Sequence, residues 1–211
     1  MPKENVLPLS SENAFRRTDE SADDNFYLLP RFVTHIDDGA ILAVTNLYRE
    51  FFPPGGEILD LMSSWVSHLP EEVKYSRVTG LGMNAAELAS NPRLTNQIVQ
   101  NLNAQTTLPF GDNEFDAAAI CVSVQYLIQP ITIFSELARV LKKDAPLVVT
   151  FSNRCFPTKA VFAWNALDDE NHIALVREYF VVSEGFSEPE IRLHEPLWGD
   201  PLLAVIGRAE K

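Results

Sequence analysis

Short apolar segments alternate with amphipathic segments along most of this chain, and that alternation restricts the folds open to it. Strands that are joined through helices lie parallel and are covered on both faces by those helices. The last two strand-like segments lie close together in sequence, so they can pair as an antiparallel hairpin at the sheet edge. We therefore expect an α/β fold. The strand-like segments are residues 57–61, 77–81, 97–100, 117–122, 147–151, 190–194 and 202–206.

Helical periodicity marks the segments between the predicted strands. The clearest is 37–52, where Asp37 or Asp38 is a plausible N-cap and Pro53–Gly56 ends the helix. Asn84 can cap a second helix, with Glu87 at the capping-box position. Residues 1–24 are polar and predict a loose arm, at least in part. The helix after Asn84 is expected over 85–90, and further helices are expected over 131–141 and 159–182, the last with a break near 168–169.

Charge and apolar content disfavour several classes of partner. The 211-residue chain has a net charge of −12 and a pI of about 4.7. Nucleic acids and anionic membranes need a basic face, so neither is an expected partner. The start of the chain shows no signal peptide, and no apolar run reaches the ~20 residues of a membrane-spanning helix. We expect a soluble, cytoplasmic protein that binds a small molecule and keeps Cys121 and Cys155 reduced; the sequence leaves its oligomeric state open.

The end of the first predicted strand is the best candidate for a ligand site. Ligands of open α/β sheets bind just beyond the carboxyl ends of the strands. Here Asp60 lies near the end of the strand, and Ser63 and Ser64 follow it. Residues this small let a ligand approach the backbone.

Four stretches of the sequence resemble the class I S-adenosylmethionine-dependent methyltransferases, of methyltransferase type 11. They are 57–64, 78–88, 108–117 and 134–142. A narrower similarity, from Tyr27 to about Phe186, is to uncharacterised methyltransferase-like proteins. The resemblance implies a Rossmann-like three-layer sandwich with a seven-stranded, mostly parallel sheet and a C-terminal antiparallel hairpin. It also implies an N-terminal arm and cap helix over 1–56, followed by a methyltransferase-like domain over 57–211.

The resemblance implies that S-adenosylmethionine is the cofactor. Asp60 would orient its ammonium group or else cap the next turn, and Ser63 and Ser64 would bind its carboxylate or form a local turn. Met83 would contact adenine or belong to the core, and Asn101 and Asn103 would contact the adenine amino group or be ordinary loop residues. The full set of cofactor-binding candidates is Asp60, Met62, Ser63, Ser64, Gly82, Met83, Asn84, Asn101, Leu102, Asn103, Val122 and Ser123.

Two positions depart from the family pattern. The first motif is usually rich in glycine, whereas this chain has Met62-Ser63-Ser64-Trp65. Trp65 could form a wall of the site or pack as part of a lid. The second strand of the family usually ends in an acidic residue that binds the ribose hydroxyls, and the matching residue here is Gly82. Losing charge-assisted bonds of about 1.5–3 kcal/mol would weaken donor binding by about one to two decades.

The residues after the fourth and fifth strands are the candidates for contact with the methyl acceptor. Tyr126 could hydrogen-bond the acceptor or pack against the next helix. Arg154 could hold an acidic substrate or form a surface ion pair. With Asn153, these are the predicted catalytic residues. Near the first helix, His35 with Asp37 and Asp38 could form a metal or base site, but capping and solvated charge explain them more simply; no metal is expected.

Two functions follow from these expectations. The first is methyl transfer from S-adenosylmethionine to a small or medium-sized acceptor by direct in-line displacement, with the N-terminal segment and the final helices covering the site. The alternative is a non-catalytic methyltransferase-like protein, with a binding or regulatory role, whose donor binding is weakened or lost.

Overall fold

A seven-stranded sheet forms the centre of the molecule, in the order β3-β2-β1-β4-β5-β7-β6. The computed structural model describes residues 13–210. The first five strands of the chain pair in parallel, and β7 lies antiparallel to both β5 and β6. This topology confirms the expected fold class. The strands are β1 (Glu57–Leu61), β2 (Arg77–Gly82), β3 (Asn96–Val99), β4 (Ala117–Cys121), β5 (Pro146–Phe151), β6 (Glu190–His194) and β7 (Leu202–Arg208).

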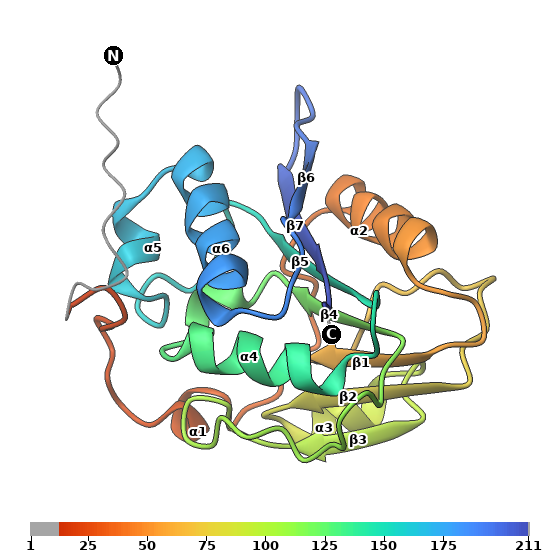
Figure 1. The fold of residues 1–211 in the computed structure, drawn as a ribbon. Helices are drawn as coiled ribbons and strands as arrows, with labels where there is room; N and C mark the ends of the chain where they lie inside the picture. The colour runs from red at the N-terminus through yellow and green to blue at the C-terminus, as the bar shows by residue number, and fades with distance from the viewer. Residues whose placement is uncertain (1–12, 211) are drawn as a thin grey trace.

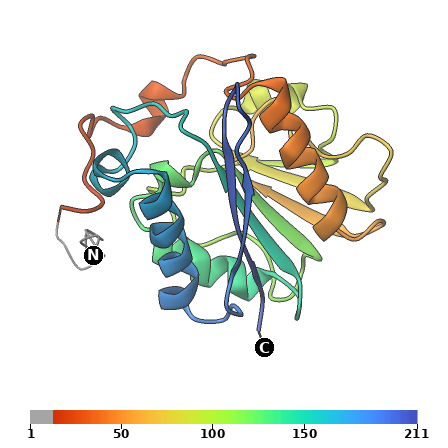
Figure 2. The same cartoon turned by 90° about the horizontal axis from the view of Figure 1, so that it is seen from above.

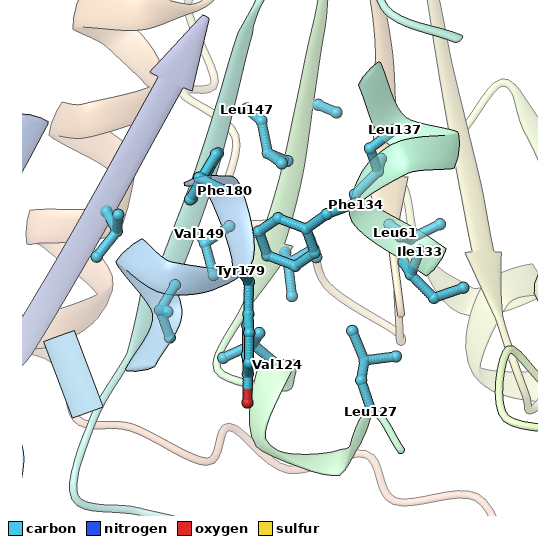
Figure 3. Packing of buried hydrophobic residues seen from close by; sticks show 14 of the residues in the cluster. Leu61, Val124, Leu127, Ile133, Phe134, Leu137, Leu147, Val149, Tyr179 and Phe180 are labelled. Atoms are coloured by element: carbon cyan, nitrogen blue, oxygen red, sulfur yellow. The ribbon is translucent and has the colours of Figure 1, made fainter. Parts of the chain in front are cut away.

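Helices cover both faces of the sheet (Figure 1). On one face, α2 buries Val44 and Tyr48 against Ile58 and other apolar residues of the central strands. On the other face, α4 and α6 pack together, and the ring of Phe134 contacts Tyr179 and Phe180 (Figure 3). The helices are α1 (Asp23–Phe26), α2 (Asp38–Phe51), α3 (Ala85–Ser90), the 3-10 turn η1 (Val124–Tyr126), α4 (Pro130–Val140), α5 (Phe162–Ala166) and α6 (Asp169–Ser183).

Helix starts follow the predicted caps with one exception. The Asp37 side chain accepts a hydrogen bond from Ala40 N and so caps α2, and Asn84 caps α3 in the same way. Asp168 caps α6 after the expected break. The capping box at Glu87 is wrong, because this carboxylate accepts hydrogen bonds from Arg31 N and Ser64 Oγ instead. A distant backbone N–H and a hydroxyl group therefore replace the local partner.

The turn before β4 and helix α4 are joined by one arginine. Arg139 donates to the carbonyl oxygens of Leu108 and Phe110 at 3.1 and 2.9 Å and to Asp112 at 2.8 Å. Glu136, bonded to Arg139, accepts from Leu108 N at 2.8 Å. The stretches 108–117 and 134–142 are thus in direct contact.

The N-terminal strap, which we define as residues 13–36, crosses the carboxyl edge of the sheet (Figure 2). Arg17 pairs with Val161 in an isolated bridge, and Asp19 N donates to Thr158 O at 2.8 Å. Residues 13–24 of the arm expected over 1–24 are therefore held against the fold, and the rest of the arm lies outside the described residues. The division into an arm with a cap helix over 1–56 and a domain over 57–211, which forms a single compact unit with that helix, stays a prediction.

Candidate functional site

A cavity of about 470 Å³ opens at the carboxyl ends of the parallel strands. Its volume lies within the range of roughly 300–1,000 Å³ that is typical of small-molecule sites. The turns after β1, β2 and β4 form its floor, the segment after β5 forms a side, and the strap covers it. All the predicted site residues line this cavity except Asp60 and Asn153.

The turn after β1 is held by buried hydrogen bonds. Asp60 accepts from the hydroxyl groups of Ser63 and Ser67, each at 2.6 Å, and Ser63 N donates to Leu81 O at 2.8 Å. Burial raises the pKa of Asp60 to about 6, although the two hydroxyl groups act in the opposite direction. Met62 has a φ of 58°, which is uncommon for a residue other than glycine. Asp60 therefore acts on the cavity through the shape of this turn.

The turn after β1 packs directly on Gly82 and leaves no room for a side chain at this position. A Cβ atom at this position would lie 2.1 Å from the backbone oxygen of Ser63. No side chain fits there without moving the turn. The missing acidic residue at the end of β2 is thus a consequence of the packing between the β1 and β2 ends.

Glu87 brings a carboxylate to the cavity from the first turn of α3. One oxygen accepts from Ser64 Oγ and the other from Arg31 N, both at 2.7 Å. Glu87 is a lining residue that the sequence analysis assigned only to capping. Ser64 lines the cavity too, but its hydroxyl hydrogen is already donated.

The lining asparagines are bonded to the surrounding scaffold. Asn84 donates to Tyr27 O at 2.9 Å, Asn101 donates to Asp24, and Asn103 donates to Asp23 and to Tyr126 O. Each of the three therefore fixes the strap or a neighbouring loop. These contacts are those of loop residues with a structural role.

The turn after β4 is strained. Val122 lines the cavity with a φ of 47°, and a β-branched side chain rarely adopts this conformation. Its N–H donates to Thr150 O at 2.8 Å, which holds the turn in place. Next to it, the Ser123 hydroxyl is buried and has no hydrogen-bond partner among residues 13–210. Strain and an unsatisfied hydroxyl at one cavity wall are features that binding sites often retain.

The segment after β5 forms the side wall with Tyr126. The Tyr126 hydroxyl accepts from Phe156 N at 2.8 Å, and burial raises the pKa of Tyr126 to about 12. At neutral pH this hydroxyl therefore keeps its proton and can donate it in a hydrogen bond. Arg154 lines the cavity while its Nε donates to Asp200 at 2.8 Å. Asn153 lies outside the lining.

The strap supplies lining residues that, apart from His35, the sequence analysis did not single out. Tyr27, Arg31, Thr34 and His35 are the main ones, and burial, with Arg31 as a further cause, lowers the pKa of His35. Trp65 does not line the cavity, since its ring nitrogen donates to Val33 O at 3.1 Å and thereby fastens the strap. The lid-packing alternative for Trp65 fits this contact.

Both thiols and the acidic clusters show no sign of a reactive or metal centre. Cys121 and Cys155 are free, and burial raises the pKa of both, that of Cys121 to about 11. Within residues 13–210, no group of three His, Cys, Asp or Glu side chains could hold a metal ion. Side chains of this cavity can therefore hold and orient a ligand, but they offer no ready nucleophile.

Residues 62–149 match the model of a methyltransferase domain. No curated protein matches the chain.

None of the helices in the described part of the chain has both the length and the apolar character needed to cross a membrane.

Solved structures with the same fold are remote in sequence. A methyltransferase in complex with the Haloferax volcanii Trm112 activator is 16% identical, with a TM-score of 0.59 over 82% of this chain and 95% of that chain. The [4+2]-cyclase SpnF is 15% identical, with a TM-score of 0.60 over 89% and 91%. A SAM-dependent methyltransferase from Thermotoga maritima is 18% identical, with a TM-score of 0.55 over 82% and 88%. At these identities the similarity shows the fold alone.

Proposed function

We propose, from the class I S-adenosylmethionine-dependent methyltransferase domain that this chain carries, that it transfers a methyl group from S-adenosylmethionine to a small or medium-sized acceptor. The model of a methyltransferase domain matches residues 62–149. The observation that carries the proposal is the cavity, which lies at the carboxyl ends of the strands and is lined by nearly all the residues that the motifs select.

The lining residues fit an adenosyl donor in size and in chemistry. Met83 and Leu102 offer apolar surface for the adenine ring, and the turn 62–64 offers backbone and small side chains to the amino-acid end. Since Gly82 carries no carboxylate, Glu87 is the proposed acceptor for the ribose hydroxyls; its oxygens keep further lone pairs. The donor supplies an electrophilic methyl group when it is bound.

Positioning supplies most of the proposed rate gain, because a direct displacement needs the acceptor atom in line with the methyl group. Tyr126 donates a hydrogen bond to the acceptor, since its raised pKa of about 12 keeps it neutral. His35 is uncharged at neutral pH because its pKa is lowered, so it can take up a proton that the acceptor loses. The strap excludes water from the cavity.

Calorimetric titration with S-adenosylhomocysteine, the demethylated product, tests this function. We expect binding by the wild type and an affinity about tenfold weaker for Met83→Ala, since burying a smaller apolar side chain loses about 1–2 kcal/mol. Met83 is only partly buried, so the fold should survive. Leu42→Ala, at a position on α2 that is 59% exposed, is the control with unchanged affinity.

The result that contradicts the proposal is an absence of any response to millimolar S-adenosylhomocysteine. That result would leave the non-catalytic alternative. Ser63→Trp would be a poor probe of donor binding, because the Ser63 side chain is buried against Asp60 and Gly80. A tryptophan there would disturb the turn itself.

A further inference from the structure

Arg31 is a cation in the cavity wall for which residues 13–210 provide no counter-ion. Its Nη2 donates to Phe26 O at 2.8 Å, whereas its Nη1 is buried and has no hydrogen-bond partner within residues 13–210. None of the ion pairs found in that range involves Arg31. A guanidinium group in such a place has N–H donors left for a ligand.

The two carboxylates that line the cavity are already engaged. Asp23 accepts from Arg17 at 2.7 and 2.9 Å and from Asn103 at 2.9 Å, and Lys159 Nζ lies 3.2 Å from it. Glu87 accepts from the Ser64 hydroxyl and from the backbone N–H of Arg31. Within the described part of the chain, the positive charge of Arg31 therefore stays unpaired, although the full sequence carries a net charge of −12.

Aromatic rings hold the guanidinium group in position. Its central carbon lies 4.5 Å from the ring centroid of Phe26, 5.6 Å from that of Tyr27 and 5.4 Å from that of Phe156. Rings of this kind attract the charge but do not replace the hydrogen-bond acceptors that its N–H groups need. The group is therefore fixed before any ligand arrives.

The guanidinium group of Arg31 lies beside the wall of the cavity that holds Tyr126. Phe156, which it contacts, follows β5 and stacks against Tyr126 with centroids 6.0 Å apart. A second guanidinium group, that of Arg154, lines the same cavity and uses only its Nε on Asp200 within the described structure. Two arginines and an aromatic wall thus surround the place where the acceptor would lie.

We propose that Arg31 binds a carboxylate or phosphate group of the methyl acceptor, with an apolar or aromatic part of the same molecule resting against Phe156 and Tyr126. The acceptor is then an organic anion. This inference rests on the proposed function, because it takes the wall with Tyr126 as the acceptor side. Arg154 supplies the second N–H fork to the same end of the molecule.

Paired probes that differ only in charge test the inference. The probes are benzoate with benzamide and phenyl phosphate with phenol, titrated calorimetrically into the full chain with and without S-adenosylhomocysteine. We expect the wild type to bind each anion about tenfold more tightly than its neutral counterpart, and Arg31→Met to lose that preference. Arg31→Lys keeps the positive charge but lacks the paired N–H donors of a guanidinium group, so this variant should keep part of the preference for anions.

Arg16→Met is the matched control, since the Arg16 side chain is 70% exposed and its carboxylate contact, with Glu20, is at 4.0 Å. This variant should behave as the wild type. Equal affinity for anions and neutral probes in the wild type would overturn the inference, as would an anion preference that survives in Arg31→Met.

One further outcome separates the two molecules that could carry the anion. If Arg31→Met weakens S-adenosylhomocysteine but not 5′-methylthioadenosine, which lacks the carboxylate, Arg31 binds the donor and the inference is wrong. If the wild type does not bind S-adenosylhomocysteine, the proposed function is wrong. The preference for anions can still be measured in the titrations without S-adenosylhomocysteine.

Discussion

Asp60 is a carboxyl group that the fold has buried at some energetic cost. It is 5% exposed and accepts two hydroxyl hydrogen bonds, yet its pKa is raised from 3.8 to about 6 because burial outweighs those bonds. A carboxyl pKa raised on folding means that the folded state binds more protons than the unfolded state between these values. The contribution of Asp60 to stability is therefore greatest below about pH 3.8 and is lost as pH rises through about 6.

Asp60→Asn should remove this pH dependence and keep the shape of the side chain. From the raised pKa, we expect the wild type to lose roughly 1 kcal/mol of unfolding free energy relative to the variant between pH 5 and pH 8. Urea unfolding of both proteins at the two pH values measures it. Parallel curves for the two proteins would show that the Asp60 pKa is not raised.

Gly82→Ala should be strongly destabilising, because the added Cβ would meet the backbone oxygen of Ser63 at 2.1 Å. We expect a loss of about 3 kcal/mol in urea unfolding, near the upper end of effects of overpacking. Gly111→Ala is the control, since a Cβ there would contact only the Glu114 side chain at 3.7 Å. A stable Gly82→Ala protein would mean that the turn after β1 yields easily.

The sequence predicts the positions of these residues better than their contacts. Periodicity places Asp60, Ser63 and Gly82 at strand ends, and the structure puts them at the same edge of the sheet. Hydrogen-bond partners depend on three-dimensional proximity, so Glu87 was assigned a local partner although it binds Arg31, 56 residues away in the sequence.

At the scale of elements, the turn 108–116 and α4 form one unit through Arg139. The guanidinium group bonds two backbone carbonyl oxygens and two carboxylates, and its side chain is 30% exposed. The bond to Glu136 is the main reason why the pKa of that carboxyl group is lowered. Without the arginine, the two carbonyl oxygens and Glu136 lose their shared donor.

Arg139→Met should therefore cost about 3 kcal/mol of unfolding free energy, a value typical of breaking a connected network of charged hydrogen bonds. Arg192→Met, which removes exposed ion pairs to Glu50 and Glu190, is the comparison and should cost less than about 1 kcal/mol. Similar losses in the two variants would show that the link between turn and helix contributes little.

Much of the secondary structure was predictable because strands and helices carry their own periods, and α2, α3 and α6 also carry their own caps. The break at 168–169 was visible in the aspartates, and Asp168 does cap α6. The strap was not predictable, because its order comes from polar contacts with residues more than 100 positions away, such as those between Lys159 and the backbone of Asp19 and Ser21.

At the scale of the whole molecule, the strap joins the start of the chain to the segment after β5. Lys159 is fully buried, and its Nζ lies 3.2 Å from both Asp19 and Asp23, and 2.7 Å from Ser21 O. One ammonium group thus holds the cover of the cavity to its wall. Cavity closure and the order of the strap should change together.

Lys159→Met should loosen the strap, because removing one member of a buried ion-pair cluster typically costs about 3–5 kcal/mol. We expect the sheet to stay intact. Limited trypsin digestion followed by mass spectrometry should show faster cleavage after Arg31 than in the wild type. Saturating S-adenosylhomocysteine should slow that cleavage, since a ligand under the strap stabilises its closed form. Unchanged cleavage in the variant would mean that other contacts hold the strap.

The contact between Gly82 and the Ser63 carbonyl also has an evolutionary consequence. A lineage with this packing can regain an acidic residue at the second strand only if the loop after the first strand changes as well. In an alignment of relatives, the two positions should therefore covary: chains with glycine at the first should keep the serine-bearing loop, and chains with a carboxylate there should have a different one.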